Sequence, residues 1–112
     1  MNYSIFMANP DSLNPEFRGA FNRIMKEIYA PFVKSIKPET RIKKLVKYQH
    51  DYDFWLGYIL GDILGRAMQL FKNEYGRDPT DDERFEIEEI IQLFLKEFRE
   101  TLAKNLNHKL DD

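Results

Sequence analysis

The stretch WLGYILGDILG, residues 55–65, carries three glycines at intervals of four within an apolar run. Its apolar residues recur at helical spacing, so an α-helix is expected here, although each glycine lowers helix stability by about 1 kcal/mol relative to alanine. Gly57, Gly61 and Gly65 advance only ~40° per step around such a helix and therefore form one stripe beside the apolar face. Because missing side chains let another helix approach closely, the stripe predicts a helix-packing surface.

The apolar pattern of this stretch extends far along the chain in both directions. At 100° per residue, the apolar residues from Ile42 to Phe71 stay on one arc, which favours one central helix over residues 38–75, bent near residue 50. Asp51 and Asp53 are suitable N-caps, so a break into two helices is the alternative. A helix of about 38 residues spans roughly 57 Å, more than its neighbours in the chain can cover. A homodimer is therefore favoured, in which dimerisation completes the helical bundle. A crossing within the chain and the approach of a ligand or another protein are the alternative uses of the stripe.

A first helix is expected over about residues 14–30. Asn14 is a good N-cap and Pro15 suits the first helical position. Apolar residues then recur at steps of three and four, which defines one buried face. Pro31 lacks a backbone N–H, so the helix is expected to end or kink just before it.

A clear turn separates the central helix from the last one. Gly76 suits the left-handed residue that closes a helix, and Pro79 cannot continue it. Thr80 and Glu83 have the spacing of a capping box, in which each side chain bonds the backbone N–H of the other residue. The last helix is therefore predicted over about residues 81–106. The sequence predicts an all-α fold of three main helices.

Composition places the chain among ordered globular proteins, since 43% of its 112 residues are hydrophobic and 14% are aromatic. One domain, residues 1–112, is expected, with an irregular arm over 1–12 and a frayed tail over 107–112. The chain has no cysteine, which excludes disulfides and thiolate chemistry. The longest apolar stretch is shorter than the roughly 20 residues of a membrane span, and the N-terminal residues do not resemble a signal peptide. We expect a cytoplasmic protein without membrane association.

The sequence contains no catalytic constellation. His50-Asp51 is similar to the signature of HD phosphohydrolases, but that chemistry needs further metal-binding histidines, and none lies upstream. Glutamate pairs at 86/89 and 97/100 lie on one predicted helix, about 16 Å apart by helix rise, and are expected to be solvated. No strand precedes the glycines, so they form no phosphate-binding loop. We therefore expect neither enzyme activity nor a bound metal or cofactor.

The segment 37–47 is strongly basic, whereas the segment 78–89 is acidic and the net charge of the chain is only −2. The basic helix face consists of Lys37, Arg41, Lys43, Lys44 and Lys47. Several cations along a helix can contact phosphates in a salt-dependent, sequence-tolerant way. A solvated face, or docking to an acidic protein surface such as 78–89 of a neighbouring subunit, is the other interpretation.

Two aromatic residues of the opening stretch, Trp55 and Tyr58, are expected on the more polar side of the central helix beside Asp62 and Arg66. They are either partly buried under a neighbouring helix or form an exposed contact site for a partner. The sequence thus favours a small helical interaction or structural module that self-associates through its glycine-striped helix. A small nucleic-acid-binding subunit that uses the basic face is the alternative.

Overall fold

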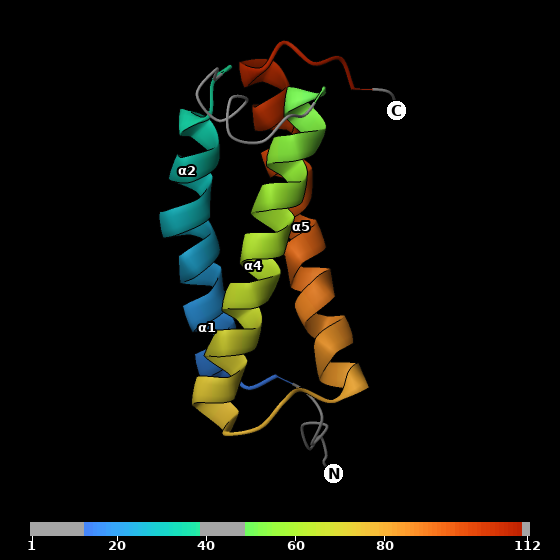
Figure 1. Cartoon of the computed structure of the whole chain (residues 1–112). Helices are drawn as coiled ribbons and strands as arrows, with labels where there is room; N and C mark the ends of the chain where they lie inside the picture. Colours follow the sequence, from blue (N-terminus) through green and yellow to red (C-terminus); the bar gives the residue numbers. More distant parts are fainter. Residues whose placement is uncertain (1–12, 39–48, 111–112) are drawn as a thin grey trace.

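The computed structural model of the chain describes residues 13–38 and 49–110, and the remaining residues are drawn as a grey trace in Figure 1. The predicted irregular arm and residues 111–112 lie outside the described residues. The described residues form an all-α fold without strands, as predicted. The elements are α1 (Pro15–Ile24), the π-helical turn η1 (Met25–Tyr29), α2 (Ala30–Ser35), α4 (Asp51–Tyr75) and α5 (Asp81–Asn105). They form three rods, of which α1, η1 and α2 make the first, and α4 runs antiparallel to both the first rod and α5 (Figure 1).

The helix ends that local chemistry predicts are confirmed. Asn14 caps α1, where its Oδ1 accepts a hydrogen bond from Phe17 N at 2.7 Å. Gly76 follows α4 in the left-handed region, with φ 70° and ψ 14°. Thr80 and Glu83 form the complete capping box at the start of α5. These ends depend on residues close in sequence, which explains why the sequence alone indicates them.

The first rod continues past its predicted end near residue 30 and stops at Ser35, so that boundary is wrong. Within η1, the Ala30 N–H donates to the Met25 carbonyl, five residues back instead of the usual four. Pro31 follows this wider turn. Because the hydrogen-bond register has already shifted, the missing N–H of Pro31 does not end the helix.

The π-helical turn also decides which side chains of the first rod are buried. Buried residues recur every four positions, at Phe17, Phe21, Met25, Tyr29 and Val33. In a regular α-helix such a row drifts around the axis by ~40° per step, and a turn with an extra residue opposes that drift. Ile28, which regular spacing places on the buried face, is 45% exposed instead.

Of the predicted central helix over 38–75, the structure shows the part from Asp51 onward, and residues 39–48 lie outside the described residues. The bend expected near residue 50 is a break, because His50 has an extended backbone with φ −122° and ψ 107°. Asp51 and Asp53 lie in the first turn of α4, where the helix dipole favours carboxylates. With 25 residues, α4 spans roughly 37 Å. The other rods cover that length, so the predicted excess length no longer supports a second chain.

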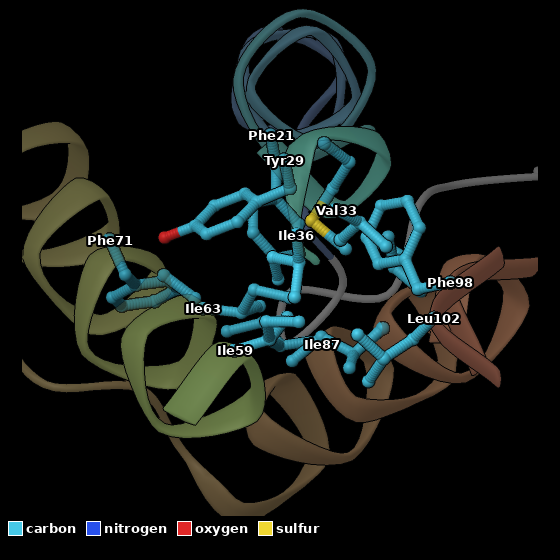
Figure 2. Packing of buried hydrophobic residues seen from close by; sticks show 14 of the residues in the cluster. Phe21, Tyr29, Val33, Ile36, Ile59, Ile63, Phe71, Ile87, Phe98 and Leu102 are labelled. Carbon is cyan, nitrogen blue, oxygen red and sulfur yellow. The ribbon is translucent and has the colours of Figure 1, made fainter. Parts of the chain in front are cut away.

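One apolar core joins the three rods. Figure 2 shows Phe21 and Val33 from the first rod pointing into the same core as Ile63 of α4 and Ile87 and Leu102 of α5. The first rod packs against both other helices, with α1 approaching α4 most closely and α2 approaching α5 most closely, while α4 and α5 also contact each other. Fully burying one such side chain contributes about 1.5–3 kcal/mol, so this core is the main source of stability.

Hydrogen bonds fix both ends of the bundle. At one end, Asn14 N donates to Tyr75 Oη at 2.8 Å and ties the start of α1 to the end of α4. At the other end, Asn105 Nδ2 donates to the carbonyl oxygens of Val33 and Lys34 at 3.3 and 3.0 Å. These carbonyls belong to the last turn of α2, where the Val33 carbonyl also accepts from the Ile36 N–H at 3.2 Å.

The turn between α4 and α5 holds an ion pair that the capping pattern alone does not reveal. Arg77 Nη1 and Nη2 donate to Glu83 Oε1 and Oε2 at 2.8 and 3.0 Å. The Glu83 side chain is completely buried. The bonds from Arg77, followed by those from Thr80, lower the pKa of Glu83 to about 2 despite its burial. Glu83 therefore stays ionised at neutral pH.

Candidate interaction surface

The glycine stripe of α4 faces solvent. Gly57, Gly61 and Gly65 are exposed, and a Cβ placed on any of them meets no atom within 4 Å beyond its own stretch of helix. The neighbouring rods pack instead against the row that contains Ile59 and Ile63, which are fully buried. The stripe is therefore not used for a helix crossing among the described residues.

An apolar groove lies beside the stripe, between α4 and α5. Leu60, Leu64 and Met68 of α4 lie next to the glycine stripe, and their side chains are half-buried. With α5 they line two neighbouring hollows of about 260 and 300 Å³. We call Gly57, Gly61, Gly65, Leu60, Leu64 and Met68 together the glycine face. This surface is apolar, and open space lies over the three glycines of the stripe.

On the other side of α4, an aromatic cluster meets the first rod. Trp55 and Tyr58 lie 5.7 Å apart between ring centroids, and the ring of Phe32 lies 6.3 and 6.2 Å from them. The rings meet in edge-on or tilted orientations, which aromatic quadrupoles favour. Trp55 is half-buried, with an indole N–H that has no hydrogen-bond partner within residues 13–38 and 49–110, whereas Tyr58 is 52% exposed. Trp55 is thus partly buried under the neighbouring rod, whereas Tyr58 exposes an aromatic surface.

Tyr58 forms one wall of an open cleft of about 470 Å³ between the first rod and α4, which we call the aromatic cleft. It is lined by Ile28, Tyr29, Pro31, Phe32, Tyr58, Asp62 and Arg66. The exposure of Ile28 follows from the π-helical turn, which rotates Tyr29 inward in its place. Such turns are found frequently at functional sites.

Three polar side chains are linked at one end of the aromatic cleft. Tyr29 Oη donates to Asp62 Oδ2 at 2.5 Å and accepts from Arg66 Nε at 3.0 Å. Arg66 Nη2 lies 3.9 Å from the same carboxylate oxygen, and its guanidinium carbon lies 5.7 Å from the centre of the Tyr29 ring. Figure 2 shows the Tyr29 hydroxyl pointing out of the apolar core on the α4 side. The polar end is thus anchored to the core by the ring of Tyr29.

Burial, followed by the hydrogen bond to Asp62, raises the pKa of Tyr29 to about 12. The hydrogen bond from Arg66 to Tyr29 raises the pKa of Arg66 in turn. At neutral pH the hydroxyl is therefore protonated and the guanidinium is charged. This arrangement suits binding by hydrogen bonds and charge, because neither Tyr29 nor Arg66 is poised to exchange a proton near pH 7.

Of the five residues of the predicted basic face, the described part of the chain includes one, Lys37. Lys37 is exposed just after α2. Arg41, Lys43, Lys44 and Lys47 lie outside the described residues, so their arrangement on one helix face stays a prediction.

Neither a metal-binding cluster nor a membrane-spanning helix is found among the described residues. Residues 13–38 and 49–110 contain no group of three or more His, Cys, Asp or Glu side chains placed to hold a metal ion. None of the helices in the described part of the chain is long and apolar enough to cross a membrane.

Comparisons of the chain with protein-family models, with curated proteins and with solved structures give no significant match.

Sequence reasoning identified only the α4 side of the aromatic cleft. Helical spacing placed Tyr58, Asp62 and Arg66 next to one another, as the structure shows. It missed Tyr29 and Phe32, which come from the first rod. Their positions depend on the π-helical turn, and the signal in the sequence was the four-residue recurrence of large apolar side chains.

Proposed function

We propose that this protein is a small helical interaction module that self-associates through the glycine face of α4. The observation that supports this proposal is the exposure of all three glycines of the stripe. Together they lower the helix stability of α4 by roughly 3 kcal/mol relative to alanine. Among the described residues no close packing offsets this loss, whereas a closely approaching second helix would.

A second copy of the chain is the partner that the stripe fits best. Gly57 and Gly65 lie at equal distances on either side of Gly61. In an antiparallel contact centred on Gly61, Gly57 of each copy would therefore meet Gly65 of the other, as a two-fold interface requires. Leu60 and Leu64 would flank the contact and add apolar area to it.

The solution mass tests this proposal, measured by light scattering during gel filtration. We expect a mass near twice that of the 13.5 kDa chain. Gly61→Leu should yield monomers because it overpacks the contact, yet it should leave the fold of each chain intact, since open space surrounds Gly61. Glu97→Leu is the matched control, because Glu97 is exposed on the side of α5 opposite Leu95 and should leave the mass unchanged.

A wild-type protein that stays monomeric at high concentration would overturn the proposal, as would a dimer that Gly61→Leu leaves unchanged.

The 260/280 nm absorbance ratio of the same gel-filtration peak tests the alternative, nucleic-acid binding through residues 37–47. A raised ratio that falls with salt, and that is lost when Lys43, Lys44 and Lys47 become glutamine, would favour that alternative. The cytoplasmic location stays a prediction, which fractionation of the source cells would check.

A further inference from the structure

We infer that the aromatic cleft binds a cationic side chain, an arginine of a partner protein, between the ring of Tyr58 and the carboxylate of Asp62. The cleft lies on the opposite side of the stripe from the α4–α5 groove. This inference therefore does not depend on self-association through the glycine face.

The carboxylate of Asp62 has room for a further hydrogen-bond donor. Its Oδ2 accepts from Tyr29 Oη and faces Arg66 Nη2, while Oδ1 has no hydrogen-bond partner among the described residues. The Asp62 side chain is 44% exposed, so a ligand can reach it. An ionised carboxylate accepts hydrogen bonds at both oxygens and pairs best with a planar guanidinium.

Tyr58 supplies an aromatic surface on the side of Asp62 away from Arg66. The two residues are four apart in α4 and therefore lie on the same helix face. Trp55 and Phe32 contact the ring of Tyr58 and hold it at the cleft. A cation above such a ring is attracted by the ring quadrupole, and arginine makes this contact more often than lysine.

The other end of the cleft already contains the same kind of contact. Arg66 lies four residues after Asp62, approaches its carboxylate and places its guanidinium over the ring of Tyr29. A ligand arginine would repeat this arrangement on the Tyr58 side of Asp62. The hydrogen bond from its Nε holds Arg66 toward Tyr29, and Arg66 lies one helical turn after Asp62 whereas Tyr58 lies one turn before it.

Trp55 provides a built-in probe for the test, since it is the single tryptophan of the chain and contacts Tyr58 and Phe32. The ligand is an acetyl-Ala-Arg-Ala-amide peptide, and its control contains citrulline, the neutral isostere of arginine. We expect the arginine peptide to change Trp55 fluorescence in a saturable way, with a dissociation constant in the millimolar range. The amide NMR shifts of Tyr58 and Asp62 should move with the same constant.

Three variants locate the binding to the cleft. Asp62→Asn keeps an oxygen that can accept from Tyr29 but removes the charge, and Tyr58→Leu removes the aromatic face; each should weaken binding by roughly five- to tenfold. Asp53→Asn removes an exposed carboxylate elsewhere on α4 and should not change the affinity. Thermal melts of the variants check that each is folded.

Equal binding of the citrulline peptide would overturn the inference, and so would an unchanged affinity in Asp62→Asn. The absence of a saturable change in both fluorescence and amide shifts would also overturn it. Gly61→Leu should bind the arginine peptide with wild-type affinity, because it alters only the glycine face. Failure of self-association and failure of the cleft are therefore distinguishable.

Discussion

Ile59 and Ile63 on one side of α4 are completely buried, whereas Gly57, Gly61 and Gly65 on another side are exposed and have open space where a side chain would be. Both rows have the same four-residue spacing and come from the same stretch of sequence. The isoleucine row holds the fold together, and the glycine row adds nothing to it among the described residues. Periodicity therefore locates the faces of a helix, but the packing of distant segments decides which face is buried.

The sharpest way to test this comparison is to truncate one side chain on each side of α4. Ile63→Ala should lower the free energy of unfolding by about 2–5 kcal/mol, because it leaves a cavity in the core. Leu64→Ala, which shortens a half-buried side chain of the glycine face, should lower it by only about 1 kcal/mol. Urea unfolding measures both values. An effect of Leu64→Ala as large as that of Ile63→Ala would contradict this assignment of the two faces.

The same contrast between buried and exposed groups applies to charges at the α4–α5 turn. Glu83→Gln should lower the free energy of unfolding by about 1.5–3 kcal/mol, because it weakens charged hydrogen bonds to a buried group. Asp78→Asn is the control, since Asp78 pairs with Lys72 at 3.7 Å while its side chain is 85% exposed. Such a surface pair contributes about 0–1 kcal/mol.

Acid titration sharpens the prediction for Glu83. Its pKa is about 2 in the folded chain, below the ordinary value of 4.5. The ionised carboxylate therefore stabilises the fold fully above pH 4.5, and this contribution disappears as the pH falls toward 2. Circular dichroism melts across this range should show a smaller loss of stability in Glu83→Gln than in the wild type. Identical acid profiles would show that Glu83 is not the group responsible.

Substitution of glycines tests the glycine row directly. Gly61→Ala should raise the free energy of unfolding of the monomer by about 1 kcal/mol, since alanine favours the helix and open space receives its methyl group. Gly76→Ala should lower it by about 1 kcal/mol, because Gly76 has a φ of +70°. Thermal melts in dilute solution measure both. A destabilised Gly61→Ala monomer would mean that the space beside Gly61 is occupied.

An effect of similar size to that of the glycine substitutions is expected at the aromatic cleft. Tyr29→Phe keeps the buried ring and removes the hydroxyl that bonds Asp62 and Arg66, which should lower the free energy of unfolding by about 0.5–1.5 kcal/mol. The pKa of Tyr29 is raised from 10.0 to about 12, so its contribution is complete below pH 10 and is lost as the pH rises toward 12. Melts between neutral and alkaline pH should therefore show a shallower decline in Tyr29→Phe. An equal decline would contradict the role of Tyr29.

Features fixed by neighbouring residues were predictable from the sequence. The cap at Asn14, the left-handed Gly76 and the capping box of Thr80 with Glu83 each involve groups a few residues apart. The all-α class and the bounds of α5 follow from strong helical periodicity. The α4 side of the aromatic cleft was predictable for the same reason, because positions four apart share a helix face.

Features that depend on the meeting of distant segments were not predictable from the sequence. The π-helical turn before Pro31 changes which side chains are buried, and local propensities do not indicate it. The helical spacing of apolar residues continues without interruption past His50, although His50 has an extended backbone and α4 begins at Asp51. The second bonding partner of Glu83, the guanidinium of Arg77, and the position of Tyr29 against Asp62 likewise require the folded chain.

The position of the first rod against both α4 and α5 has a consequence for how the molecule opens. Because α1 approaches α4 most closely and α2 approaches α5 most closely, one continuous helix supports both members of the α4–α5 pair. If either α4 or α5 detaches, the first rod loses its contacts with that helix and part of the shared core becomes exposed. Partial opening is therefore nearly as unfavourable as complete unfolding, so the three rods should behave as one cooperative unit. The slowest amide hydrogens of α4 and α5 should then exchange with the same free energy of opening.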